Sequence, residues 1–473
     1  MKYLIFGTGD YYNRYKKWFA PEDIIAFIDN SEYKQHTLID DKPVMSVKEG
    51  VKLSYDVIII LSFYVKTMKK QLIDCGVDEK KIYHFYDLYK IFNIKDSTKE
   101  IEVYGNIKKH NLSQMSSSIK KNRILLLSQD LTLGGPAIAL YHVAQVLKEY
   151  GYEVVFGSMI DGPLKEKILE SDIPVVIDNN LQVFTMNDCE WTNNFSLILC
   201  STINYYVFLS DRDCNIPVIW WLHDSLFFYD GVDKELLKNI DRTNLTVTSV
   251  GSIPKQAICT YVKNLPVSQL IYGVEDMTNL QKKQYNYGEV KSEKVCFITI
   301  GYIESRKGQD ILIEAIKRMP EDLRTKAVFY IVGQDSSAMA VQIKEEIVCM
   351  PEIIMTGTMN RNQINEILNK ADVLVCPSRE DPMPTVAAEA MMHSVPCLVS
   401  SATGTASYLS NEENGFIFTS EDVQDLSDKL QLCIKKKNEL CCIGKNARKV
   451  YEKHFSMPVF RKAVIEMVKK ILN

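Results

Sequence analysis

Short apolar runs alternate with amphipathic helical stretches along most of the chain. The stretches between the runs, such as Ile138–Tyr150 and Ile311–Ile316, have helical spacing. Strands that alternate with helices predict parallel sheets, so we expect an α/β fold made of Rossmann-like domains. The runs with the length and the Ile, Val and Leu content of buried strands are Tyr3–Phe6, Ile24–Ile28, Val57–Leu61, Arg123–Ser128, Gly151–Phe156, Val218–Leu222, Val295–Ile300 and Ala371–Cys376.

Two polar stretches divide the chain. Asn93–Asn122 is rich in Lys, Ser and Asn, with a short strand expected at Ile101–Tyr104, and Gln281–Glu293 is the second polar stretch. We therefore predict one small Rossmann-like domain followed by two larger Rossmann-like halves. The predicted parts are a domain at 1–95, a linker at 96–122, halves at 123–285 and 286–455, and a terminal amphipathic helix at 456–473.

Composition agrees with an enzyme that works in the cytoplasm. Apolar residues make up 46% of the chain, and the net charge of −4 gives no electrostatic reason to expect nucleic-acid binding. The 12 cysteines show no Cys-x-x-Cys pair, so we expect free thiols. We expect no signal peptide and no membrane span, so a membrane-bound acceptor would be met from the surface at the inner face.

The most informative run is Pro377–Met391, which follows a buried strand and opens into a helix. Asp381 lies in the loop and Glu389 inside the helix, with seven residues between them. Eight helical steps rise roughly 12 Å, which is the scale that separates the sugar from the ribose in a nucleotide-sugar. The helix start between them, at Thr385, suits a diphosphate. An ordinary strand–loop–helix with two solvated acids is the alternative.

Three other strand ends carry candidate residues. Arg306 and Lys307 follow the strand Val295–Ile300, where a cation would neutralise a departing pyrophosphate. The Gly134-Gly135 turn follows the first strand of its half, and glycines let the backbone approach a ligand closely. His223 ends the strand Val218–Leu222 at the position where open α/β sheets place ligands. A purely structural role remains an alternative for each, and we expect Asp224 to cap the turn that follows it.

Together these motifs resemble the retaining glycosyltransferases of family 4, which have the GT-B fold, over about residues 123–473. The family pattern is Glu, seven residues, Glu, and Asp381 stands at its first position. The family often has an arginine directly after the glycine that ends the strand, where this chain has Tyr302, so Arg306 is expected to supply that charge. The terminal helix is expected to pack back on the first half, as it does in the GT-B fold.

The resemblance implies roles for the candidate residues. Lys307 would meet the donor diphosphate, Glu389 the ribose and Asp381 the sugar hydroxyls. His223 would lie beside the anomeric carbon, and the Gly134-Gly135 turn beside the phosphates and the acceptor. Gly404 is expected in a loop at the same site. No Asp-x-Asp suited to a metal is evident, so we expect a metal-independent enzyme without a cofactor.

The N-terminal segment carries a Rossmann-like pattern of its own. Gly7-Thr8-Gly9 follows a strand, and Asp29 ends the next strand about 20 residues later. The third glycine of a dinucleotide fingerprint is missing. The segment resembles the nucleotide-sugar-binding domain of bacterial sugar O-acyltransferases, with an empty scaffold as the alternative. We expect residues 1–95 to fold independently, to be dispensable for chemistry, and to engage the acceptor or a partner enzyme.

The resulting hypothesis is a retaining hexosyltransferase. It would move a sugar from a nucleotide-sugar, with UDP as the expected nucleotide, to a hydroxyl of a glycan, lipid-linked or protein-linked acceptor in bacterial surface polysaccharide or glycoconjugate biosynthesis. Two alternatives remain open at this point. One is a non-catalytic partner subunit of a glycosyltransferase complex, and the other is a GT-B nucleotide-sugar epimerase.

Overall fold

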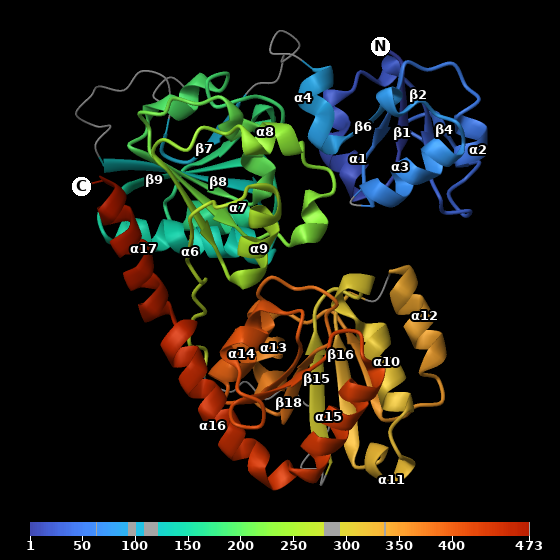
Figure 1. The fold of residues 1–473 in the computed structure, drawn as a ribbon, viewed down its shortest axis with the longest axis vertical. Coiled ribbons are helices and arrows are strands. Elements are labelled where there is room, and N and C mark those ends of the chain that lie inside the picture. Colours follow the sequence, from blue (N-terminus) through green and yellow to red (C-terminus); the bar gives the residue numbers. More distant parts are fainter. Residues whose placement is uncertain (63, 93–100, 108–121, 279–293, 335–336, 473) are drawn as a thin grey trace. The chain divides into compact units, whose positions relative to one another are not determined.

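The structure is a computed structural model that describes residues 1–62, 64–92, 101–107, 122–278, 294–334 and 337–472. The chain forms two compact units. The first consists mainly of residues 1–247 and 257–267, and the second mainly of residues 248–256 and 268–471. Three sheets with helices on their faces confirm the predicted α/β class (Figure 1).

The accessory domain, which we define as the described residues 1–92, is built on a six-stranded sheet of order β3-β4-β2-β1-β5-β6. Its strands are β1 (Tyr3–Phe6), β2 (Ile24–Ile28), β3 (Leu38–Ile39), β4 (Lys42–Met45), β5 (Val57–Ile60) and β6 (Ile82–His84). Its helices are α1 (Asp10–Tyr15), α2 (Val47–Gly50), α3 (Val65–Asp74) and α4 (Leu88–Ile91).

Alternation along β1 buries both faces of this sheet. Leu4 and Phe6 belong to one apolar cluster, which includes Met68 and Leu72 of α3. Tyr3 and Ile5 point to the other face, and their cluster runs on without interruption into the next domain of the chain.

That next domain is built on an eight-stranded sheet of order β14-β13-β12-β11-β8-β9-β10-β7. Its strands are β7 (Glu102–Tyr104), β8 (Arg123–Asp130), β9 (Glu153–Ile160), β10 (Val175–Ile177), β11 (Leu197–Ser201), β12 (Val218–Leu222), β13 (Leu245–Ser249) and β14 (Val267–Gln269). Its helices are α6 (Gly135–Glu149), α7 (Leu164–Glu170), α8 (Lys234–Lys238) and α9 (Ser252–Tyr261).

Two predictions for this region need adjustment. The short strand expected near Ile101–Tyr104 is present as β7, and it pairs antiparallel with β10. Part of the predicted linker therefore belongs to a sheet. The helix expected to begin at Ile138 begins at Gly135, so the glycine turn forms the first turn of α6, with Pro136 favouring that start.

The third domain has a six-stranded sheet of order β17-β16-β15-β18-β19-β20, in which neighbouring strands are parallel. Its strands are β15 (Val295–Ile300), β16 (Ala327–Val332), β17 (Ile353–Gly357), β18 (Val373–Cys376), β19 (Cys397–Ser400) and β20 (Gly415–Phe418). Its helices are α10 (Gln309–Lys317), α11 (Glu321–Arg324), α12 (Ala338–Glu346), α13 (Arg361–Leu368), α14 (Thr385–Met392), α15 (Val423–Lys435), α16 (Lys437–His454) and α17 (Met457–Leu472).

Numbered from β15, this strand order is 3-2-1-4-5-6, the order of a doubly wound Rossmann sheet. Its two faces carry different helices. Leu398 packs in the cluster that contains residues of α10 and α15. Its neighbour Cys397 points the other way and donates from Sγ to the carbonyl of Ala387 in α14. The order in which successive strands are added to the sheet reverses between β15 and β18, so the ligand site of this sheet is expected at the carboxyl ends of these two strands.

The predicted terminal helix is present as α17, while its packing on the first half stays a prediction. The polar crossing predicted at Gln281–Glu293 lies outside the described residues. Independent folding of residues 1–95 stays a prediction, but their apolar core is shared with the domain that follows. One apolar cluster contains Trp18 and Phe85 of the accessory domain together with Phe184 and Tyr229 of the domain that follows.

Candidate functional site

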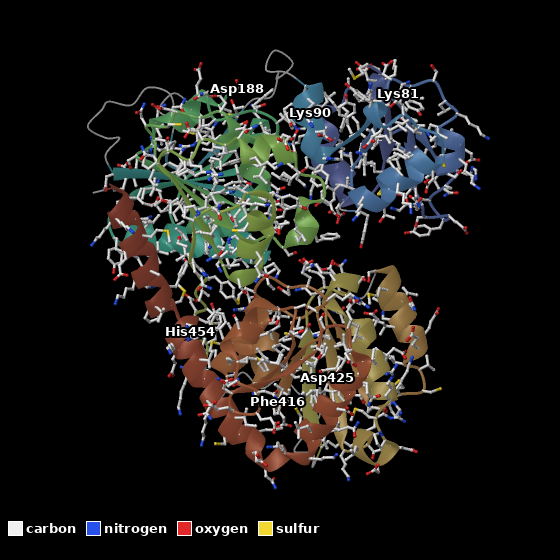
Figure 2. The ribbon with its side chains drawn as sticks, in the orientation of Figure 1. Lys81, Lys90, Asp188, Phe416, Asp425 and His454 are labelled. Atoms are coloured by element: carbon white, nitrogen blue, oxygen red, sulfur yellow. The ribbon has the colours of Figure 1, made fainter. Side chains whose placement is uncertain are left out.

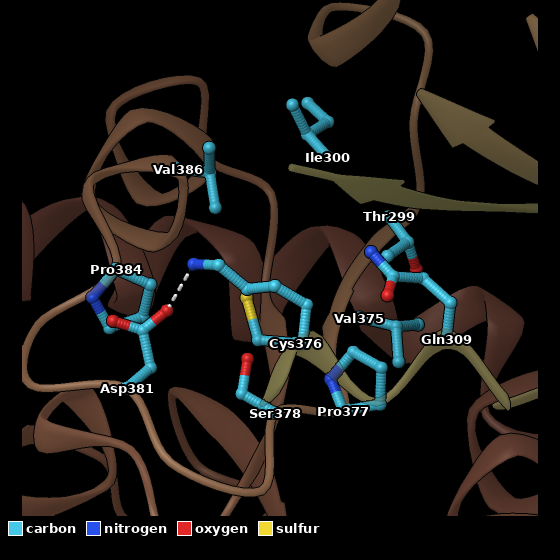
Figure 3. Close-up of a pocket in the computed structure, with 11 residues that line it drawn as sticks. Thr299, Ile300, Gln309, Val375, Cys376, Pro377, Ser378, Asp381, Pro384 and Val386 are labelled. Atoms are coloured by element: carbon cyan, nitrogen blue, oxygen red, sulfur yellow. Dashed lines mark hydrogen bonds and ion pairs between the residues drawn. The ribbon is translucent and has the colours of Figure 1, made fainter. Parts of the chain in front are cut away.

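A pocket opens at the point where strand order reverses in the third domain. Thr299 and Ile300 line it from the end of β15, and Val375 and Cys376 line it from the end of β18 (Figure 3). The remaining lining residues come from the two loops that leave these strands and from the first turns of α10 and α14, and are Lys307, Gln309, Pro377, Ser378, Asp381, Pro384 and Val386.

Lys307 and Asp381 meet in this pocket. The Nζ atom of Lys307 lies 2.5 Å from Oδ2 of Asp381 (Figure 3). The side chain of Asp381 is only 7% exposed and that of Lys307 is 21% exposed. Partial burial strengthens such a pair relative to one in open water. The structure thus brings together two of the predicted site residues from separate loops.

Arg379 holds these two loops against each other. Its guanidinium donates to both carboxylate oxygens of Asp310, at 2.9 and 2.6 Å, and its backbone N–H donates to the carbonyl of Arg306 at 2.9 Å. A two-point arginine–carboxylate contact fixes orientation as well as distance. This role of Arg379 was not predicted, although the residue lies within the run Pro377–Met391.

Gly308 makes the close approach of the two loops sterically feasible. Its φ is +69°, in the left-handed region, and a Cβ at this position would collide with the carbonyl oxygen of Pro377. Gly308 therefore forms, without strain, the turn that places the preceding residue, Lys307, at the pocket.

Arg306 lies near the site but is engaged elsewhere. Its Nη2 is 2.8 Å from the carboxylate of Glu304, and its Nη1 donates to the carbonyl of Glu380 at 3.3 Å. Arg306, the expected second cation, thus lies where the loops after β15 and β18 meet, and Glu304 partly neutralises its charge. Tyr302, at the position where the family often has arginine, is 67% exposed.

Thr385 begins α14, between Pro384 and Val386, which both line the pocket. Glu389 lies in the same helix and is buried, and its Oε1 is 2.5 Å from Nη1 of Arg361 at the start of α13. Each of the two predicted donor-binding carboxylates therefore faces a cation. The pairing of Glu389 with Arg361 was not predicted, because 28 residues separate them in the chain.

The loop that carries Gly404 lies against Asp381. The N–H of Asp381 donates to Ala402 at 3.2 Å, and the N–H of Gly404 donates to the carbonyl of Asp381 at 2.9 Å. A Cβ on Gly404 would collide with the carbonyl of Pro382. Gly404 therefore allows this loop to hold the backbone of Asp381, at the place where the sequence predicted it.

Several buried polar atoms at this site have no hydrogen-bond partner among the residues that the structure describes. Two of them, Oγ1 of Thr299 and Oε1 of Gln309, belong to residues that line the pocket. The hydroxyl of Tyr272 is a third. Burial raises the pKa of Tyr272 well above its usual value, with further upward contributions from Asp381 and Glu389. Sequence reasoning did not single out these residues, because they belong to no motif.

The other candidates belong to the first unit. His223 directly follows β12, and its ring centroid lies 4.4 Å from that of Trp221. Burial lowers the pKa of His223 to about 3, so the imidazole is neutral at physiological pH. Asp224 does not cap the following turn as predicted. Its carboxylate accepts from the N–H of Ile203 at 2.6 Å, because β11 and β12 are neighbours in the sheet.

The predicted glycine turn follows β8. Gly134 is the N-cap of α6, and Gly135 is the first residue of that helix. The N–H of Gly134 donates to Oγ1 of Thr132 at 3.4 Å. Thr132 in turn donates from its N–H and its hydroxyl to Asp130, at 3.0 and 2.6 Å. The turn is thus held by a short polar chain from the end of β8.

Asp29, at the predicted crevice of the accessory domain, is held by residues of the same domain. Its Oδ2 accepts from both the N–H and the hydroxyl of Thr8, and Nζ of Lys34 lies 3.5 Å away. Burial opposes ionisation of Asp29, but these hydrogen bonds, led by the Thr8 hydroxyl, and Lys34 lower its pKa overall. Nucleotide binding in this domain stays a prediction.

The described part of the chain contains no group of three or more His, Cys, Asp or Glu side chains placed to hold a metal ion. None of its helices is both long enough and apolar enough to cross a membrane.

Comparison with known proteins agrees with this architecture. Residues 281–450 match the family model described as "Glycosyl transferases group 1", and residues 120–251 match "Glycosyl-transferase family 4". Residues 1–83 match "C2185-like, N-terminal". The resemblance of the accessory domain to sugar O-acyltransferases stays a prediction.

Curated relatives are similar over part of their length. The lipopolysaccharide glucosyltransferase WaaG of Escherichia coli is 25% identical over 143 residues, which are 30% of this chain and 38% of WaaG. An Escherichia coli UDP-Gal:alpha-D-GlcNAc-diphosphoundecaprenol alpha-1,3-galactosyltransferase is 28% identical over 144 residues, 30% of this chain and 37% of the relative. The chain thus spans less than half the length of these relatives.

Solved structures share the fold. Anabaena HepE in complex with UDP-glucose has a TM-score of 0.62 at 18% identity, covering 74% of this chain and 99% of HepE. The WaaG structure has a TM-score of 0.56 at 15% identity, covering 72% of this chain and 98% of WaaG. The fold is therefore GT-B, preceded by a small α/β domain. The family models and the shared fold together support a glycosyltransferase.

Proposed function

We propose that the protein is a retaining glycosyltransferase that moves a hexose from a UDP-sugar to a hydroxyl of a glycan, lipid-linked or protein-linked acceptor. Its proposed place is bacterial surface polysaccharide or glycoconjugate biosynthesis. The observation that carries the proposal is the Lys307–Asp381 pair at the reversal of strand order, beside the start of α14. The similarity to a lipopolysaccharide glucosyltransferase and to a galactosyltransferase supports the substrate class.

Donor binding is proposed to break the contact between Lys307 and Asp381 and to give each residue a new partner on the donor. A diphosphate at the start of α14 would compete with Asp381 for Lys307, since it carries more negative charge and also meets the helix N-terminus. Asp381, released from Lys307, would then accept hydrogen bonds from sugar hydroxyls. Glu389 would accept from the ribose hydroxyls in exchange for its contact with Arg361.

In the proposed reaction, the acceptor oxygen bonds to the anomeric carbon, and the bond from that carbon to the diphosphate oxygen breaks. The acceptor proton leaves with the departing diphosphate. Lys307 stabilises the negative charge that grows on this leaving group, a role that needs no divalent ion. His223 and the Gly134-Gly135 turn belong to the other compact unit. We propose that His223 donates a hydrogen bond to the transferred sugar as a neutral imidazole.

A thermal-shift panel of nucleotide-sugars tests the donor class. UDP and UDP-hexoses should raise the melting temperature, since a ligand at 100 times its Kd stabilises by roughly 2.7 kcal/mol. GDP-mannose and ADP-glucose serve as matched controls. Stabilisation by these and not by UDP compounds would overturn the proposed donor. Slow sugar release is expected from the bound UDP-hexose. Isomerised donor would indicate an epimerase, and binding without cleavage a non-catalytic partner subunit.

A further inference from the structure

The accessory domain contacts the next domain through two pairs of aromatic side chains, one of them in the shared apolar cluster. The ring of Trp18 lies 6.0 Å from that of Phe184, nearly perpendicular to it, and both are buried. The ring of Tyr64 lies 6.4 Å from that of Phe227 in the same edge-on arrangement. Rings at these distances pack favourably. Trp18 and Phe184 are shielded from water in the shared apolar cluster, whereas Tyr64 is 60% exposed and its contact lies at the surface.

One ion network crosses the same boundary at α4. Lys90, labelled in Figure 2, lies 2.8 Å from Oδ1 of Asp87 in its own domain and 3.0 Å from Oδ2 of Asp233 in the next. The hydroxyl of Tyr89 donates to the same oxygen of Asp233 at 3.0 Å. Asp233 is also the N-cap of α8, where its Oδ1 accepts two backbone N–H groups. Lys90 and Tyr89 of the accessory domain thus contact Asp233, the residue that caps α8.

A second ion pair reaches the glycine turn. Nη1 of Arg14 lies 3.6 Å from Oδ2 of Asp130. The other oxygen of that carboxylate holds Thr132, and Thr132 accepts the N–H of Gly134. A continuous chain of polar contacts therefore runs from the accessory domain to the turn that begins α6.

All four contacts end at segments that follow the carboxyl ends of strands. Asp130 ends β8, Phe184 follows β10, and Phe227 and Asp233 follow β12. In parallel sheets of this kind, ligands bind at the carboxyl edge, where the loops between strand and helix form the site. The loop between β12 and α8 begins with His223, and the loop after β8 contains Gly134. The accessory domain therefore contacts the two loops that carry the predicted site residues of this domain.

We propose that the accessory domain is a positioning element of the active site, which fixes the Gly134 turn through Arg14 and the His223 loop through Lys90. The effect of this positioning on catalysis rests on the proposed function. The positioning of the two loops does not depend on it. Arg14 and Lys90 act through Asp130 and Asp233 and touch no reacting atom. The accessory domain is then required for an ordered site, in contrast to the dispensable module that the polar linker suggested.

Hydrogen exchange on the full-length protein tests the positioning without reference to activity. In the double variant Arg14→Met and Lys90→Met, backbone amides of residues 131–135 and 223–233 should exchange roughly threefold faster or more, the order expected for loss of charged hydrogen bonds. Residues 301–310 and 377–392 should exchange as in the wild type. Lys69→Met is the matched control, because it removes the ion pair of Lys69 with Glu79 inside the accessory domain.

If the double variant folds poorly, a single variant and a conservative substitution still test the proposal. Lys90→Arg should restore slow exchange at 223–233, and Arg14→Met alone should affect only 131–135. Unchanged exchange in these loops, or an equal change in Lys69→Met, would overturn the proposal. The thermal shift with UDP should persist in every variant. If the wild type shows no thermal shift with UDP, the proposed function is contradicted, and the hydrogen-exchange test of positioning is unaffected.

Discussion

Lys307 and Asp381 form an ion pair at 2.5 Å, although 74 residues separate them in the chain. The contact exists because β15 and β18 are neighbours in the sheet and their following loops meet at the reversal of strand order. The lysine that would neutralise a leaving diphosphate is thus paired with the carboxylate that would hold the sugar. Binding and chemistry at this site are therefore expected to respond to the two residues in different ways.

Replacing Asp381 separates plain nucleotide binding from sugar transfer. Asp381→Asn removes the anion that competes for Lys307, so UDP should bind several-fold more tightly. Cleavage of a UDP-hexose should fall by about 100-fold, because the carboxylate no longer orients the sugar. Calorimetry with UDP and a hydrolysis assay measure the two effects. Glu380→Gln changes the neighbouring acid and should leave both nearly unchanged. Weaker UDP binding in Asp381→Asn would contradict the partner exchange.

Glu389 and Arg361 distinguish a ribose-binding role from a structural ion pair. Glu389→Gln should weaken UDP binding by about tenfold, as expected when hydrogen bonds to a charged group are lost. Arg361→Met should leave UDP affinity equal or higher, since it frees Glu389 for the ribose. Both variants break the same ion pair, so each serves as the control for the other. Equal losses of thermal stability with unchanged UDP affinity would mark Glu389 as structural.

His223 makes stability depend on pH in a predictable direction. Burial lowers its pKa to about 3 in the folded protein, whereas an ordinary histidine takes up a proton near 6.5. The unfolded chain therefore binds more protons below pH 6.5, and the folded state loses about 1.4 kcal/mol per pH unit from this group. Urea unfolding at pH 7.5 and pH 5 measures the effect. His223→Gln should lose about 2 kcal/mol less than the wild type over that range. Parallel pH dependences would show that His223 titrates normally.

Sugar release should survive removal of divalent ions. The proposed clamp takes its positive charge from Lys307 and the start of α14, so excess EDTA should leave the rate within about twofold of the untreated enzyme. Magnesium and manganese are added back as the control. Complete loss with EDTA and recovery with either ion would show that a metal takes part in the reaction.

The strands could be predicted because their signal is local. Runs such as Val295–Ile300 and Val57–Leu61 are buried on both faces, and this leaves a continuous apolar pattern in the sequence. Gly404 was expected in a loop at the same site, and its loop contacts Asp381 because both residues follow strands that lie side by side. Features set by one stretch of chain, or by the order of adjacent strands, were therefore open to sequence reasoning.

Pairings between distant side chains could not be predicted. Arg361 with Glu389 and Arg14 with Asp130 leave no periodic pattern, because each partner alone resembles a solvated charge. The polar linker suggested an independent accessory domain, yet linker composition carries no information on what Trp18 packs against. Asp224 was misread as a cap for the same reason, since its partner Ile203 belongs to the neighbouring strand's loop.

The most direct test follows the hydrolysis of the UDP-hexose that binds best by proton NMR, in the wild type and in Lys307→Ala. The wild type should release the α anomer before mutarotation. Lys307→Ala should fold normally and release sugar about 100-fold more slowly, the order of 3 kcal/mol of lost leaving-group stabilisation. Lys317→Ala, which alters only an exposed ion pair with Glu314 and Glu346, should match the wild type. Release of the β anomer first, or an unchanged rate in Lys307→Ala, would contradict the proposed retaining transfer at this site.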